Sequence, residues 1–146
     1  MNASRIELAE RFLQEAVYRS RAKQAAETAV RSGDPSAGNC GLGARPALAL
    51  DLSERGRELF DALQPTASAA LDVEHVRSVM RDWIRAQDAF DRQRNHFLKA
   101  FRHEHGFDRR AYAPATSAAY DAGLADIHAE SNAALHAAAE RLLAGA

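Results

Sequence analysis

The chain has 146 residues and a formal net charge of −1 at pH 7, which predicts a single domain and argues against a strongly basic nucleic-acid binder as a whole-chain property. Hydrophobic residues make up 47% of the chain, but 33 of them are alanines, and Val, Ile and Thr together number only 11. Few β-branched residues beside abundant Ala and Leu favour helices over sheets. The longest apolar runs are much shorter than the roughly 18 residues of a membrane span, and the sequence has neither a secretory pattern nor a second cysteine. We therefore expect a cytoplasmic all-α protein that does not cross a membrane.

A first helix is predicted over residues 1–32. Ser4 and Glu7 have the spacing of a capping box, in which a hydroxyl and a carboxylate satisfy free backbone amides at a helix start. Apolar residues then follow at helical spacing. Beyond Tyr18 they are almost all alanine, so we expect this half to make few core contacts before the helix stops at Gly33.

Residues 33–50 are predicted to form a linker and an extended arm. The first fourteen of them contain four glycines and two prolines, a composition that breaks regular elements. Leu48, Leu50 and Leu52 then alternate, as in an extended segment that lays its leucines on one surface.

A helical core is predicted over residues 51–146, and it begins with a short helix near 52–63. Asp51 and Glu54 form a second capping box at its start, and Pro65 closes it. We expect the short helix to pack on the long helices that follow it.

The strongest pattern predicts an antiparallel hairpin of two long helices, at about 71–105 and 114–143. The first of them has a heptad seam over about seven turns. Its residues are mostly apolar, and the spacing between them alternates between four and three. The seam residues are Val76, Met80, Trp83, Gln87, Phe90, Arg94, Phe97 and Phe101. The last helix repeats this spacing from Tyr120 onward, and Pro114 suits its first turn. Since a short loop joins the seams, we predict a bundle-like fold in which the first helix and the short helix pack on the hairpin.

Gly106 is predicted to end the first hairpin helix as a glycine cap. The residue after such a cap often packs back on the last helical turn, here near Phe101 or Arg102. Phe107 is therefore expected to be partly buried at the far end of the hairpin.

The sequence contains no catalytic, metal-ligating or cofactor-binding constellation. The six histidines include no Glu-x-x-His pair, and His103 and His105 would point about 200° apart on a helix. Cys40 lies in a glycine-rich stretch, GNCGLG, that matches neither a dinucleotide-binding nor a phosphate-binding loop. We therefore predict a protein that is not an enzyme and that uses no metal or cofactor.

A basic stripe is the charged feature that stands out. With about 100° per residue, the seam occupies roughly 300° to 40° of the long helix and the stripe about 80° to 180°. We predict that the stripe and two arginines of the next loop bind a partner: Arg77, Arg81, Arg85, Arg92, Lys99, Arg102, Arg109 and Arg110. Two other interpretations stay open, namely a solvated face and a face that docks against the acidic last helix.

Polar residues interrupt the seam at Gln87 and Arg94, and Ser131 occupies the matching stripe of the last helix. Arg94 either reaches solvent at the seam edge or lies in an interface with a second chain. Since aromatic residues and arginine dominate binding hot spots, the predicted interface or core anchors are Trp83, Phe90, Arg94, Phe97 and Phe101.

The sequence favours a non-enzymatic helical interaction protein: an adaptor, chaperone-like factor or inhibitor that binds another protein with an acidic surface. A homodimer is one form of this hypothesis. The alternative is a small nucleic-acid-associated regulator that uses the basic stripe, although no helix-turn-helix, zinc finger or basic zipper arm is apparent.

Overall fold

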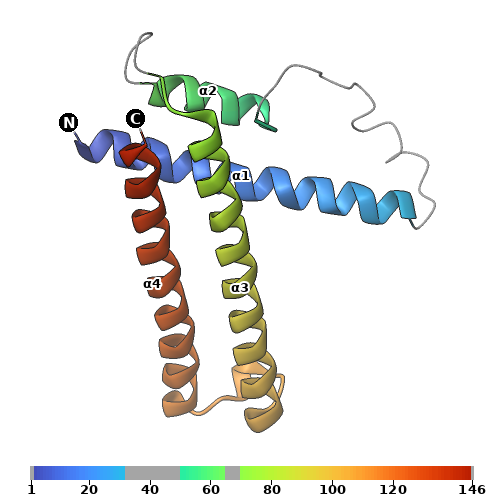
Figure 1. Cartoon of the computed structure of the whole chain (residues 1–146). Helices are drawn as coiled ribbons and strands as arrows, with labels where there is room; N and C mark the ends of the chain where they lie inside the picture. Colours follow the sequence, from blue (N-terminus) through green and yellow to red (C-terminus); the bar gives the residue numbers. More distant parts are fainter. Residues whose placement is uncertain (1, 32–49, 65–69, 146) are drawn as a thin grey trace.

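A computed structural model describes residues 2–31, 50–64 and 70–145 (Figure 1). These residues form four α-helices, which are α1 (Asn2–Arg31), α2 (Glu54–Leu63), α3 (Val73–His105) and α4 (Pro114–Ala144), and one short 3-10 turn, Arg109–Ala111. The helices pack against one another and no strand occurs in the described ranges, so the predicted all-α, bundle-like fold is confirmed. Most of the predicted linker lies outside the described residues, and so do Leu48 and Cys40.

Helices α3 and α4 form the predicted antiparallel hairpin. The Asp72 side chain accepts a hydrogen bond from the Glu74 amide at the start of α3, where a free helical amide needs a partner. Gly106 ends this helix with a φ of 95°, a backbone conformation that favours glycine. Pro114 occupies the first turn of α4, as predicted, because its missing amide hydrogen costs nothing there.

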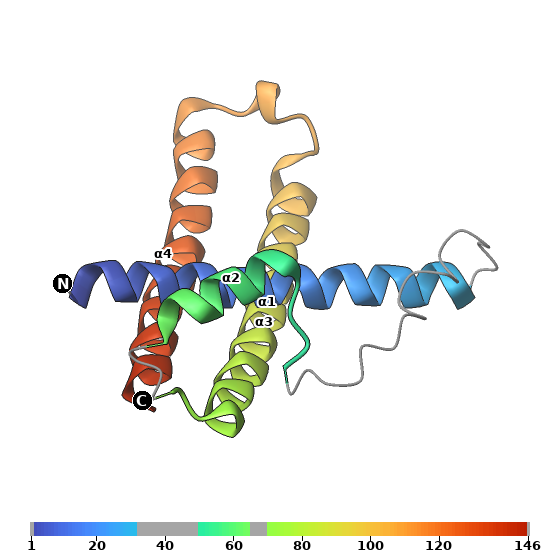
Figure 2. The ribbon, with the colours of Figure 1, turned by 90° about the horizontal axis from the view of Figure 1, so that it is seen from above.

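Helix α1 is the central layer of the fold. It crosses the base of the hairpin, and α2 lies on its other side (Figures 1 and 2). The core therefore gathers where three layers meet, and it is composed of apolar side chains from all four helices and from the segment before α2. Its buried residues are Ala9, Phe12, Leu13, Ala16, Val17, Leu50, Leu59, Leu63, Leu71, Val76, Val79, Met80, Trp83, Leu135, Ala139 and Leu142.

The second half of α1 extends beyond the hairpin (Figures 1 and 2). Among the side chains of α1 that the structure describes, Val17 is the last buried one, and Tyr18 is already 65% exposed. This follows from the sequence, because the residues after Tyr18 offer only small apolar side chains to a core.

Both predicted capping boxes are misplaced. Helix α1 already includes Asn2, so Ser4 lies inside the helix and not at its start. Helix α2 is capped by Ser53, whose hydroxyl accepts from the Gly56 amide at 3.0 Å, while Asp51 pairs with α1. The Ser53 hydroxyl also donates to Glu15 of α1 at 3.3 Å, a tertiary contact that sequence spacing does not reveal.

The hairpin extends well past α1, and we call its outer part, residues 88–130, the arm (Figure 1). An aromatic cluster holds the two helices together near the tip. The Phe101 ring lies 5.3 Å from that of Tyr120 and 5.6 Å from that of Tyr112, and Phe97 lies 6.3 Å from Tyr120. These separations are typical of aromatic pairs that stabilise a fold.

The prediction that Phe107 packs back onto α3 is wrong. Its side chain is 84% exposed. Gly106 has a ψ of 166°, so the chain leaves α3 in an extended direction. Tyr112 takes the place beside Phe101, and its hydroxyl donates to the Gly106 carbonyl at 2.6 Å.

Gly123 allows the arm helices to approach closely, and its replacement by alanine is expected to destabilise the arm. A Cβ built on Gly123 overlaps the Phe97 ring. We expect Gly123→Ala to lower the free energy of unfolding by about 1–3 kcal/mol for the overpacking, offset by about 1 kcal/mol of helix propensity. Thermal unfolding followed by circular dichroism measures the net change.

The double variant Gly123→Ala with Phe97→Leu provides the control for this experiment. A smaller side chain at position 97 relieves the overlap, so the alanine then stabilises the protein relative to Phe97→Leu alone. If Gly123→Ala stabilises the otherwise unchanged chain, the close approach of α3 and α4 is contradicted.

None of the described helices has both the length and the apolar content to cross a membrane.

Candidate functional site

The predicted basic stripe lies on the outside of α3 and its following loop. Arg77 is partly buried, and the other seven residues are exposed. Arg77 forms an ion pair with Glu74, three residues away on the same helix. The stripe is therefore available to solvent or to a partner over most of its length.

The stripe does not dock against the acidic last helix, which was one interpretation of its sequence. Only Arg109 of the stripe forms an ion pair with a described residue of α4, with Asp121 at 2.6 Å, and its guanidinium lies 4.7 Å from the Tyr120 ring centre. The α3–α4 ion pair at the base runs the other way, from Arg141 of α4 to Asp82 of α3 at 2.8 Å. Its hydrogen bond holds the pKa of Asp82 below the usual range.

On the part of α3 that belongs to the arm, three stripe cations have no ionic partner among the residues that the structure describes. They are Arg92, Lys99 and Arg102, and all three are exposed. On α3 the stripe lies about a quarter to half a turn from the seam that faces α4, so these three side chains are directed away from α4.

Closer to the core, the structure places two stripe residues at the edge of a groove. The groove lies between the second half of α1 and the first half of α3 and has a volume of about 600 Å³. It is lined by Ala16, Arg19, Ser20, Lys23, Gln24, Glu27, Leu50, Asp51, Arg77, Met80, Arg81 and Ile84.

The groove joins an apolar floor to a basic rim. Ala16, Leu50 and Met80 are buried side chains that also belong to the core, and Ile84 packs against them. The rim has four cationic residues and two acidic ones: Arg19, Lys23, Arg77 and Arg81, with Glu27 and Asp51. An excess of positive charge around an apolar surface favours an acidic partner that also has apolar side chains.

Asp51 fixes part of the rim. Its carboxylate forms ion pairs with Lys23 and, at 3.4 Å, with Arg19. The hydrogen bond from Lys23 holds the pKa of Asp51 below its usual range, and burial opposes this shift. The carboxylate is therefore charged at neutral pH, and it orients two cations of α1 toward the groove.

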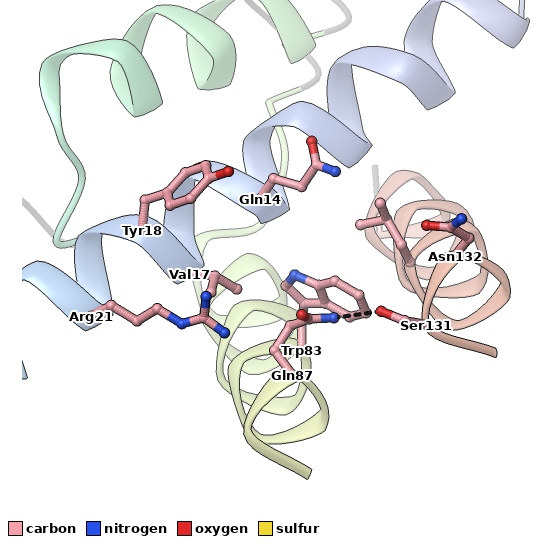
Figure 3. A pocket seen from close by; sticks show the side chains of 9 residues that line it. Gln14, Val17, Tyr18, Arg21, Trp83, Gln87, Ser131 and Asn132 are labelled. Carbon is pink, nitrogen blue, oxygen red and sulfur yellow. Dashed lines mark hydrogen bonds between the residues drawn. The ribbon is translucent and has the colours of Figure 1, made fainter. Parts of the chain in front are cut away.

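A second, smaller pocket of about 150 Å³ lies on the other flank of α1, where α1, α3 and α4 meet (Figure 3). Polar residues of the two seams form one wall, where the Gln87 amide donates to the Ser131 hydroxyl at 3.0 Å. The indole nitrogen of Trp83 is buried and has no hydrogen-bond partner in the described chain. This is an uncommon state, since a buried donor without an acceptor costs about 1–3 kcal/mol.

The predicted interface anchors fall into three environments. Trp83 is 4% exposed and belongs to the core, and Arg94 is exposed at the edge of the seam. Phe90, Phe97 and Phe101 are half-buried along the arm. The structure therefore groups these residues by depth along the hairpin and does not bring them into one site.

Arg19 and Lys23 of the groove were not among the residues predicted from the sequence. They are four residues apart, so they share one face of α1, and that spacing was visible in the sequence. What the spacing could not reveal is that this face opposes Arg77 and Arg81, which lie more than fifty residues away along the chain.

No cluster of three or more His, Cys, Asp or Glu side chains with the arrangement of a metal site occurs within the described ranges. Two histidines contact the backbone or carboxylates of other helices and not one another. One ring nitrogen of His75 lies 2.8 Å from the Arg141 carbonyl oxygen, and His136 lies between Glu10 and Glu140.

Comparison with protein families, with curated proteins and with solved structures finds no match to this chain.

Proposed function

We propose that this chain is a non-enzymatic interaction protein that binds an acidic, partly apolar segment of another protein in the groove between α1 and α3. The observation that carries the proposal is the convergence of four cationic side chains from two helices around one apolar floor. Those residues come from distant parts of the chain, so only the folded protein presents them together.

The chemistry of the groove indicates what the partner segment offers. Apolar side chains of the partner would pack on Ile84, the partly buried residue of the floor, and excluding water from this contact supplies affinity. Its carboxylates face Arg81 and Lys23, which supplies orientation and faster association. An amphipathic helix with acidic flanks meets both requirements.

Site-specific photo-crosslinking in extracts of the native host tests the proposal. A photoreactive residue at Ser20, inside the groove, is expected to give discrete adducts that mass spectrometry identifies. The same residue at His128, an exposed position on the arm, is the matched control. Identical adducts from both positions, or none from Ser20, would contradict binding in the groove.

A second candidate function is binding of nucleic acid along the arm. The observation that favours it is the row of exposed cations without ionic partners within the described chain, namely Arg92, Lys99 and Arg102. If these three neutralise phosphates, raising the salt concentration from about 50 to about 200 mM lowers the affinity for duplex DNA roughly 40-fold. Fluorescence anisotropy of a labelled duplex measures this affinity.

The charge-reversal variant Arg92→Glu with Lys99→Glu is the control for the nucleic-acid experiment. It is expected to abolish salt-dependent binding. If the unchanged protein shows no affinity, or if neither salt nor the double variant alters it, this second function fails.

A homodimer is a further form of the interaction proposal, and the half-buried aromatic residues of the arm favour it. Phe90, Phe97 and Phe101 retain exposed ring surface that a second copy could cover. Light scattering is expected to give twice the chain mass of 15.9 kDa. The variant Phe90→Glu is expected to have the mass of a single chain, because it places a charge in the apolar surface between the two copies. If the unchanged protein has the mass of a single chain at high concentration, the homodimer hypothesis is contradicted.

A further inference from the structure

The smaller pocket, where α1, α3 and α4 meet, has the features of a ligand site that is separate from the groove. Its walls come from three helices: Gln14, Val17, Tyr18, Arg21, Trp83, Gln87, Ser131, Asn132 and Leu135 (Figure 3). Val17 and Arg21 extend from α1 toward α3, on the side where Trp83 and Gln87 lie (Figure 3).

The polar part of the pocket offers several hydrogen-bond donors. The Trp83 indole N–H can only donate a hydrogen bond, and it is buried without a partner in the described chain. In Figure 3 the indole nitrogen is directed toward α1. The Ser131 hydroxyl already accepts from Gln87, which leaves its own proton free to be donated. Arg21 forms an ion pair with Asp91, but a guanidinium has five N–H groups and retains donors.

Among the described residues no carboxylate lines the pocket, and Arg21 is the one charged side chain of its lining. A site with unused donors, one cation and no anion favours a ligand that is negatively charged and rich in acceptors. Amide side chains of Gln14 and Asn132 add donors that are not committed elsewhere in the described chain.

The remaining wall is apolar, and its size limits the ligand. Val17, Leu135 and the Trp83 ring form this wall. A volume of about 150 Å³ is comparable to that of an engineered apolar cavity that admits benzene. An apolar body of one ring therefore fits beside the donors.

We propose that this pocket binds a small carboxylate with an apolar body of about one ring. The carboxylate accepts hydrogen bonds from Trp83 and Arg21, and the ring packs on Val17 and Leu135. This proposal does not depend on the groove, because the two sites share no lining residue.

Trp83 is the only tryptophan in the chain, so its fluorescence reports on the pocket directly. Titration with sodium benzoate is expected to change its emission with half-saturation on the order of 1 mM. Benzamide, which has the same ring without the charge, is expected to bind about tenfold or more weakly, because charge-assisted hydrogen bonds are stronger. A short peptide that ends in phenylalanine, tested with a free and with an amidated terminus, shows whether a protein terminus can supply the same group.

Three variants and one control variant separate specific binding from simple quenching of the fluorescence. Arg21→Gln is expected to weaken the binding of benzoate about tenfold and to leave the binding of benzamide unchanged. Asp91→Asn is expected to strengthen the binding of benzoate, because it releases Arg21 from its ion pair. Asn132→Phe fills the pocket and is expected to abolish binding. His128→Phe places the same ring one turn away on α4 and is expected to have no effect.

The proposal is overturned if benzoate produces no saturable change at about 50 mM, which would indicate a pocket that holds only water. It is also overturned if Asn132→Phe binds benzoate as well as the unchanged protein does. Circular dichroism and thermal unfolding of each variant verify that the fold is retained.

Discussion

Replacing Phe12 with alanine is expected to lower the free energy of unfolding by about 3–5 kcal/mol, the range for removing a fully buried aromatic side chain. Phe12 has no exposed surface, and its ring lies 5.9 Å from that of Phe60 in α2. Because α1 is the central layer, a cavity at this position weakens the contacts of α1 with α2 and with the hairpin together. For a chain of about this size the loss corresponds to a fall in melting temperature of roughly 6–20 °C.

Thermal and urea unfolding followed by circular dichroism measure this effect. The matched control is Tyr18→Ala, which removes an aromatic side chain from the same helix six residues later. Tyr18 is 65% exposed, so its replacement is expected to change the stability by no more than about 0.5 kcal/mol. Equal effects of the two substitutions would show that α1 does not pack between α2 and the hairpin.

Reversing two charges at the groove is expected to weaken partner binding about 100-fold. The variant is Arg81→Glu with Lys23→Glu, one residue from each helix that borders the groove. Each reversal removes an attraction for an acidic partner and adds a repulsion, and about 2.7 kcal/mol in total corresponds to this change in affinity. The affinity is measured with the partner that crosslinks to position 20.

The matched control for the groove variant is Arg92→Glu with Lys99→Glu. These residues belong to the same stripe and are exposed on the same helix, but they lie on the arm and outside the groove. The control is expected to change the affinity less than about threefold, because solvent and salt screen charges that lie far from the partner. If the arm variant weakens binding as much as the groove variant, the whole stripe forms the interface and the groove has no special role.

Local rules predicted the elements of the fold well and their ends less well. The heptad seam and the glycine at position 106 placed α3 within two residues of its observed bounds, because seven turns of consistent spacing leave little freedom in a helix assignment. The caps were misassigned because Asp51 and Ser53 both fit the start of α2. A tertiary contact decides between them, since Asp51 pairs with Arg19 and Lys23 of α1.

The aromatic residue after Gly106 shows the same limit. Sequence spacing predicted that Phe107 packs on α3, but Tyr112 occupies that position. Both residues are aromatic and both lie within reach of Phe101. The direction in which the chain leaves the glycine, which residue type alone does not determine, selects between them.

The composition and periodicity of this sequence by themselves determined an all-α fold with a long antiparallel hairpin. Abundant alanine favours helices, and apolar residues at intervals of three and four form one continuous face only on a helix. They also identified a basic stripe, since angles around a single helix follow from residue numbers. Only the tertiary structure decided that α1 crosses the hairpin at its base. That crossing brings Lys23 to Arg81 and Arg21 to Trp83, and so creates both the groove and the smaller pocket. The physical reason is that helix formation depends on neighbours within one or two turns, whereas a concave site depends on how faces of distant helices pack to exclude water.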